Sequence, residues 1–277
     1  MRILKIVTLF VAACWIVASP LHASAEDKNL EKFKISLGGY TLARNESEMS
    51  LTETNLGAGI SISPEDTLGL ETEQTVFRLD GQYRFNQAHA LTFSWYSITS
   101  DGAKRLEEQF EWVDEDGNLI TIPVGARVDT RLSYDIYKLG YLWSFYNSDK
   151  VELSAGAGLH ITRVEVSMEA ETTSSGVGAS DANLTLPLPV LSFGLIYSVN
   201  PKFSWFLKSE IFSIELEDWT GTYNDSSLGV EYVVWENVSL GIGLANNSIK
   251  VSRDTDEYKF VYANRISGMS LYVAGQF

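Results

Sequence analysis

Apolar residues recur at every second position in segment after segment of this chain, from Phe33 to the last residue. The segment 77–85 shows the pattern most clearly, because its apolar residues and Gly81 share one parity while charged and amide residues take the other. A period of two is that of a β-strand with two different faces, and sustained helical periodicity is absent from the sequence. The chain is therefore predicted to be all-β, with one apolar face on each strand.

The connections between these segments alternate between short and long. Short turns rich in turn-forming residues are predicted at 86–88, 147–149, 200–202 and 236–237. Long connections are predicted near 44–74, 100–128 and 168–186, with shorter ones near 217–222 and 252–257. Four turns and five loops imply about ten strands, an even number that returns the chain to its starting side. The pattern predicts a closed antiparallel up-and-down transmembrane β-barrel, with eight strands as the alternative if two segments lie outside the membrane.

The first 25 residues are expected to be a signal peptide, which leaves residues 26–277 as the barrel. Arg2 and Lys5 precede an apolar run over 6–17, and Ala23-Ser24-Ala25 offers a cleavage site with small residues. The alternative is that residues 11–14 form a lipobox, with a lipid on Cys14. Cys14 is the chain's one cysteine, so its removal would leave a mature chain without disulfides or thiol chemistry.

Charge and hydropathy narrow the function classes. After residue 25 no segment approaches the roughly 18 consecutive apolar residues of a transmembrane helix, so any membrane span must be a strand. Loss of Arg2 and Lys5 with the signal takes the formal net charge from −15 to −17. A chain this acidic is not expected to bind nucleic acid.

Aromatic residues gather beside the predicted short turns. They are expected to form a girdle at the periplasmic headgroup level, where rings with one polar edge are favoured. The girdle comprises Phe85, Trp143, Phe145, Tyr197, Phe203, Trp205, Trp235 and Phe277. The alternative is a soluble β-sandwich or lipocalin-like barrel whose apolar face points inward. It is disfavoured because several glycines, such as Gly156 and Gly241, occupy the opposite face.

Several stretches resemble the bacterial outer-membrane β-barrel domain superfamily. They are 68–70 with 75–85, then 135–141, then 187–191, and the closing Phe277. The resemblance implies export to the cell outer membrane, contact with its lipids and lipopolysaccharide, and recognition of Phe277 by the barrel-assembly machinery. Gly275 departs from the aromatic residue common in that signal. Because members include pores, adhesins and proteins of unknown role, the resemblance fixes the class and implies no activity or cofactor.

Charged residues of both signs fall on the face predicted to line the lumen. The predicted luminal network comprises Arg78, Asp80, Arg84, Lys138, His160, Lys208, Glu210 and Glu231. Unpaired buried charges are costly, so these residues are expected to pair across a narrow interior. The alternative is that they form a selectivity filter. A ten-stranded barrel is only slightly wider than an eight-stranded one that its side chains fill, so a wide porin channel is not expected.

Catalytic chemistry has little support in the sequence. An acyl hydrolase needs a histidine base with a carboxylate to orient it, and His160 is the one histidine predicted within a strand. Glu152 shares its strand and face but lies about 26 Å away along the strand. His160 is therefore expected to be a hydrogen-bonded luminal residue, and no enzymatic role or metal site is predicted.

The predicted loops around 46–73 and 107–116 are acidic, and the stretch 114–118 hints at a calcium loop without its ligand spacing. A solvated acidic loop is favoured there. Three functional hypotheses remain open from the sequence. The first is a structural or narrow small-solute barrel, the second a surface adhesin acting through the long loops, and the third a lipid-modifying enzyme.

Overall fold

The computed structural model describes residues 32–53, 59–107, 109–113, 119–171 and 178–277. The predicted signal peptide, Cys14 and the possible calcium loop at 114–118 lie outside these residues. None of the helices among the described residues is long and apolar enough to cross a membrane.

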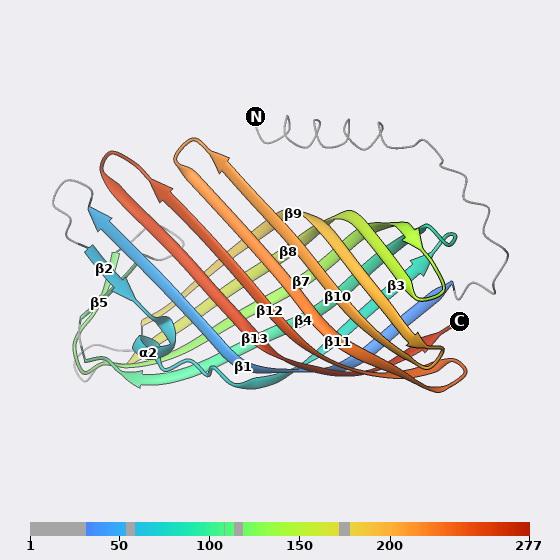
Figure 1. The fold of residues 1–277 in the computed structure, drawn as a ribbon. Helices are drawn as coiled ribbons and strands as arrows, with labels where there is room; N and C mark the ends of the chain where they lie inside the picture. Colours follow the sequence, from blue (N-terminus) through green and yellow to red (C-terminus); the bar gives the residue numbers. More distant parts are fainter. Residues whose placement is uncertain (1–31, 54–58, 108, 114–118, 172–177) are drawn as a thin grey trace. The chain divides into compact units, whose positions relative to one another are not determined.

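Ten antiparallel strands form one closed sheet (Figure 1). They are β1 (Phe33–Glu53), β3 (Gln74–Arg84), β4 (His89–Arg105), β7 (Arg127–Asn147), β8 (Val151–Glu171), β9 (Gly178–Asn200), β10 (Phe203–Leu216), β11 (Trp219–Trp235), β12 (Val238–Asp254) and β13 (Tyr258–Gln276). Each strand pairs with the next along this order, and β13 closes the ring on β1 from Lys34↔Gln276 to Glu53↔Tyr258. The predicted barrel of ten strands is confirmed, and the alternative of eight is wrong.

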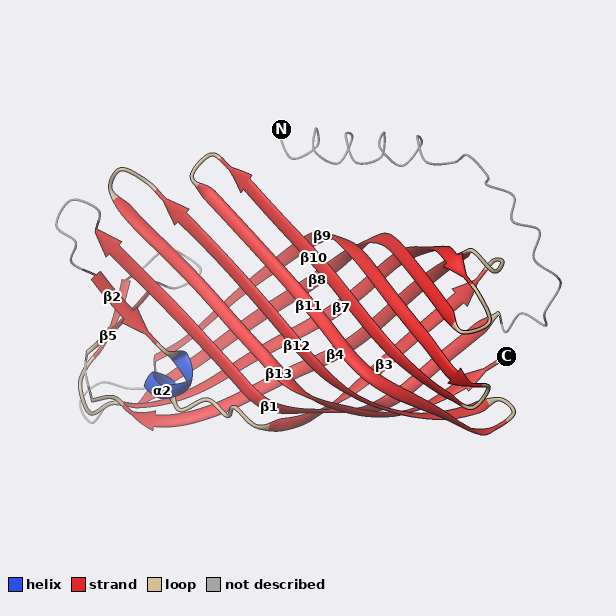
Figure 2. Cartoon of the chain, in the orientation of Figure 1, coloured by secondary structure: helices blue, strands red, loops and turns tan. Residues whose placement is uncertain are grey.

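Besides the ten strands of the ring, the described residues form three short strands and one helix (Figure 2). β2 (Gly59–Ile62) pairs with β1, and β5 (Phe110–Val113) pairs with β6 (Leu119–Ile122). The helix α2 (Pro64–Leu68) starts with a proline, whose fixed φ suits a first turn. It ends at Gly69, whose φ of 70° is left-handed and therefore favours glycine.

The two ends of the barrel differ as predicted, but the strands are longer than predicted. We call the end with the short turns and Phe277 the turn end, and the opposite one the loop end. At the loop end β1 continues through Glu46 and Glu48, and β8 and β9 extend into the predicted connection 168–186. The β10–β11 connection is only a turn, in which Glu217 adopts a φ of 53°.

The apolar face changes sides along the strands, which explains these boundaries. On β7 the apolar side chains of Tyr137, Leu139 and Tyr141 point outward and are exposed. Beyond them Ile136, Leu132 and Val128 are buried, while Asp135, Arg131 and Arg127 take the outward positions. The period of two continues with its phase reversed, so the strand persists where the outward apolar pattern stops.

The outward apolar side chains form one belt around the turn half of the barrel, as lipid contact requires. Leu139, for example, is 61% exposed. In the turn half the apolar face therefore points away from the interior, opposite to a soluble lipocalin-like barrel. The eight residues predicted for the girdle lie on or beside the turn-end strand termini, and all but the half-buried Phe203 are exposed. Phe77, Trp95 and Tyr137, which the sequence analysis did not single out as a girdle, lie at the belt's opposite border.

Candidate functional site: the barrel interior

The interior of the belt is lined by charged residues that pair in separate clusters. Near the turn end, Lys34 Nζ lies 2.6 Å from Glu231 Oε1, and Ser239 Oγ donates to the same oxygen at 2.8 Å. The Tyr272 hydroxyl donates to Glu231 Oε2 at 3.0 Å. Every oxygen of this buried carboxylate is thus satisfied, which is the condition for an ion pair to be tolerated away from water.

Two further pairs hold the arginines of β3. Arg84 Nη2 lies 2.8 Å from Glu152 Oε1 across the lumen, and Ser144 Oγ also donates to that oxygen. Arg78 binds Asp80 on its own strand through Nε at 2.9 Å, and its guanidinium lies 5.1 Å from the centre of the Tyr96 ring. The pairing of Glu152 with Arg84 separates it from His160.

The most buried group, which we call the Lys138 cluster, consists of Lys138, His160, Glu210, Tyr223 and Asp225. Lys138 Nζ contacts both acids, Glu210 at 2.9 Å and Asp225 more closely. His160 Nε2 lies 3.2 Å from Glu210 Oε2, and its Nδ1 lies 3.2 Å from the Tyr223 hydroxyl. An ionised carboxylate only accepts hydrogen bonds, so His160 Nε2 carries the proton. Nδ1 and Asp225 Oδ2, which lies 3.3 Å from the Tyr223 oxygen, are then both acceptors for the single Tyr223 hydroxyl proton.

The contacts within the Lys138 cluster indicate a structural role for His160 and not a catalytic one. His160 is 1% exposed and touches Tyr223 edge to face, with ring centres 5.2 Å apart. Among the described residues, the one hydroxyl that hydrogen-bonds to its ring is the Tyr223 phenol. The serine nucleophile of an acyl hydrolase is therefore not placed beside this imidazole in the described part of the chain.

Lys208 differs from the other luminal cations. Its Nζ lies 5.6 Å from the centre of the Phe206 ring, and no ion pair or hydrogen bond of its ammonium is found within the described residues. Its side chain belongs to the inward parity of β10, yet Lys208 is exposed. Water therefore reaches part of the lumen at this level.

Towards the loop end the interior becomes an apolar core. Side chains from β1, β4, β7, β8 and β13 meet there, among them Leu42, Ile98, Val128, Met168 and Ile266. The connections contribute as well, since Leu68, Leu70, Leu106 and Ile122 belong to the same core. The Tyr134 and Tyr262 hydroxyls meet inside this half at 3.1 Å, and burial raises the pKa of each phenol.

All eight predicted network residues belong to the inward-facing parity of their strands, and seven of them contact an opposite charge. Lys34, Tyr223 and Asp225 were missed. The parity rule could have found them, because each alternates with outward residues such as Ile35 and Leu228 on its own strand. The apolar core was also missed, because it is assembled from connections distant in sequence.

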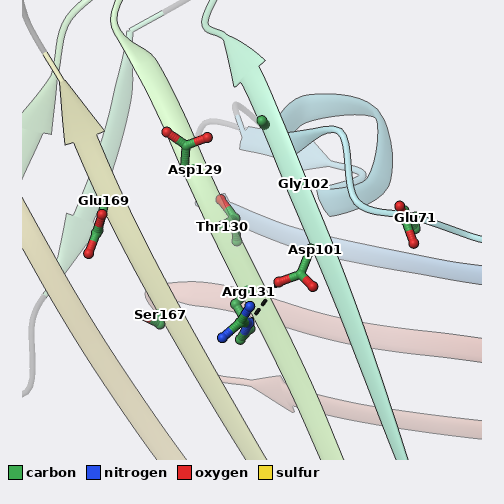
Figure 3. A pocket seen from close by; sticks show the side chains of 9 residues that line it. Glu71, Asp101, Gly102, Asp129, Thr130, Arg131, Ser167 and Glu169 are labelled. Carbon is green, nitrogen blue, oxygen red and sulfur yellow. Dashed lines mark hydrogen bonds and ion pairs between the residues drawn. The ribbon is translucent and has the colours of Figure 1, made fainter.

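The outer wall near the loop end carries a pocket of about 580 Å³ (Figure 3). Asp101, Asp129, Arg131 and Glu169 line it, together with Glu71 and small residues. Arg131 Nε binds Asp101 Oδ1 at 2.7 Å, and Arg127 Nη2 binds Asp129 Oδ1 at 2.9 Å, so Glu71 and Glu169 leave the pocket acidic. No group of three or more histidine, cysteine or acidic side chains arranged to hold a metal is found in the described part of the chain.

The fold is similar to those of solved bacterial outer-membrane proteins. The outer membrane protease OmpT from Escherichia coli is 11% identical, with a TM-score of 0.56, covering 92% of this chain and 100% of its own. The toluene transporter TodX of P. putida is 9% identical over 91% of both chains, with a TM-score of 0.37. Ail, the attachment invasion locus protein of Yersinia pestis, is 10% identical over 87% of this chain and 99% of its own, with a TM-score of 0.26.

No protein-family model matches the sequence, and no curated protein does. At these identities the likeness shows the fold and leaves the activity open, and TM-scores below 0.5 carry no argument of their own. The resemblance noted from the sequence is confirmed at that level: the chain has the fold of a bacterial outer-membrane β-barrel.

Proposed function

We propose that this chain is a structural protein of the bacterial outer membrane, a barrel with a closed interior whose strands continue at the loop end beyond the membrane. The observation that carries the proposal is the closure of the interior in the loop half. Paired charges occupy the belt, and the apolar core closes the loop half above them. A conducting pore needs a continuous aqueous path, and an apolar constriction blocks ions by excluding water.

The orientation that we propose follows from the two ends. The turn end with Phe277 faces the periplasm, where barrel-assembly machinery would read the terminal aromatic residue. The belt contacts outer-membrane lipids, and lipopolysaccharide surrounds the strands just beyond it. The acidic surface supports the expectation that nucleic acid is not a partner.

Planar-bilayer recording tests the closed interior. Purified protein inserted into a bilayer is expected to show no stepwise current, while a known porin in the same membrane conducts. Insertion is verified separately by the resistance of the belt strands to added protease. Stepwise currents from inserted wild-type protein would overturn the closed-barrel proposal and favour the narrow small-solute pore.

A second candidate function is binding at the cell surface, which the acidic wall pocket favours. It lies beyond the belt, on the outward face of β4, β7 and β8. The double variant Asp129→Asn, Glu169→Gln removes two of its charges and keeps the shape of both side chains. Cells that display this variant at wild-type level should adhere less to other cells than wild-type cells do, and equal adhesion would dismiss the pocket.

The lipid-modifying hypothesis depends on His160. In the variant His160→Ala we expect lipid A and phospholipid profiles of intact cells to remain unchanged, because the imidazole is enclosed by hydrogen-bonding partners. A changed profile would revive that hypothesis.

A further inference from the structure

At the loop end two pairings in the ring stop before the neighbouring strands end. One is the pairing of β9 with β10, and the other is that of β3 with β1 and β4. The register between β9 and β10 ends at Ile211↔Leu191, although β9 continues to Gly178 and β10 to Leu216. Residues 178–190 of β9 are therefore paired with β8 alone, and 212–216 of β10 with β11 alone. Figure 1 draws the outer ends of β8 and β9 pointing away from the β10–β11 hairpin. We call this interruption the β9–β10 break.

The other interruption is covered. β3 begins only at Gln74, which leaves the upper parts of β1 and β4 without their neighbour. There β2 pairs with β1, Leu70 forms a bridge with Gly102 of β4, and the Glu71 amide donates to the Asp101 carbonyl at 3.1 Å. No comparable segment covers the β9–β10 break within the described residues.

Two prolines stand on the unpaired edge of β9, immediately beyond the last pairing. Pro189 and Pro187 face Leu159 and Ile161 of β8, which belong to the outward apolar belt. A proline has no N–H, so these positions leave no unsatisfied donor at the border of the hydrocarbon. At these positions β10 could form only the hydrogen bonds that the proline carbonyls accept, so the two prolines weaken any extension of the ladder along this edge.

The side chains at the break are apolar on both strands. Leu188 and Val190 on β9, and Phe212 and Ile214 on β10, take the inward parity beside it, while Leu191 and Ile211 are exposed in the belt just below. Lipid tails therefore meet an apolar rim at a place where backbone pairing does not seal the wall.

We propose that the β9–β10 break is a lateral binding site for an acyl chain of a lipid in the leaflet that borders the loop end. The chain enters between Pro189 and Phe212 and rests against Leu188 and Ile214. The site does not depend on the closed interior proposed above, since an acyl chain at the wall neither requires nor creates an aqueous path.

Photolabelling from the acyl chain tests the site on the wild-type protein. The protein is reconstituted in phosphatidylcholine vesicles that contain a trace of phospholipid with a diazirine in its acyl chain, irradiated, digested and mapped by mass spectrometry. Phe206 is the matched control, because it lies on the same strand with the same inward parity where β10 is paired on both sides. Several-fold more adduct on Phe212 than on Phe206 is expected, and equal labelling would overturn the proposal.

Disulfide formation tests the break itself. In a Cys14→Ser background, Phe193→Cys with Ser209→Cys places two thiols on a directly paired position. Leu188→Cys with Ile214→Cys occupies positions that would pair if the ladder continued, and it keeps both prolines. A disulfide needs Cα atoms within about 7 Å. Oxidation in membranes should link the first pair and leave the second largely free, and equal linkage of both pairs would show that the wall is closed there.

Discussion

At the scale of single residues, the interior is governed by the cost of unpaired charge. Lys138 neutralises two acids at once, whereas the Lys208 ammonium has no ionic contact within the described residues. Both lysines have the inward-facing parity, Lys138 on β7 and Lys208 on β10. They therefore offer a matched pair for measuring what an ion-pair contact contributes.

Lys138→Met leaves Glu210 and Asp225 without their cation, so we expect it to lower the free energy of unfolding by about 3 kcal/mol or more. Lys208→Met removes no ion pair and should cost much less. Urea unfolding of both variants in phospholipid vesicles measures the difference. Equal losses would show that Lys138 is held by packing and not by its acids.

Tyr134 and Tyr262 predict how stability depends on pH. Both lie beyond the belt, and burial raises the pKa of each phenol above its ordinary value of 10.0. Unfolded phenols ionise near pH 10 while these stay protonated, so their contribution is complete below about pH 10 and lost above it. The free energy of unfolding, measured from pH 8 upward, should stay level and then decline. Tyr134→Phe should flatten the decline, whereas Tyr137→Phe, whose ring faces outward, should not.

At the scale of elements, the connection through α2 is fitted closely against β4. A Cβ on Gly102 would lie 2.7 Å from the Leu68 carbonyl oxygen and 2.8 Å from the Gly69 carbonyl carbon. Both neighbours are backbone atoms, so they cannot yield without moving the segment that brings Leu68 and Leu70 into the apolar core.

We therefore expect Gly102→Ala to displace residues 63–71 and to destabilise the loop half by about 1–3 kcal/mol. Gly39→Ala is the control, because its Cβ would meet only the Thr75 methyl at 3.4 Å. Limited proteolysis of membrane-embedded protein should cut the Gly102 variant faster between 54 and 73. Identical cutting of both variants would mean that the close approach is not required.

At the scale of the whole molecule, the belt differs from the loop half in which face of the strands is apolar. The outward face is apolar in the belt, and the inward face is apolar in the loop half. On β7 the change occurs between Ile136 and Tyr137. Its position predicts the effect of a charge placed on the outward face at each level.

Leu139→Arg puts a charge into the belt and should cost about 2–4 kcal/mol of folding free energy in a bilayer. Ser133→Arg puts the same charge on the outward face of the same strand beyond the belt, and should cost almost nothing. Unfolding in vesicles compares them. A comparable penalty at both positions would place the membrane border closer to the loop end.

Much of the fold could be predicted because a strand with lipid on one side must alternate, and the turns at Asn86 and Asn200 carry their own local signals. The predicted positions of the strand ends at the loop side were wrong for a related reason. Only outward apolar residues were followed, so the inward pattern through Leu132 and Val166 was not recognised as a continuation of the same strands.

The sequence by itself determined the alternation, the even strand count and the parity of each charged residue, because these depend on near neighbours in the chain. Only the tertiary structure decided which charges meet, that Glu152 binds Arg84 instead of joining His160, and where the pairing of β9 with β10 stops. Those outcomes depend on the shear of the closed ring, which sets residues far apart in sequence at the same height and which no single segment encodes.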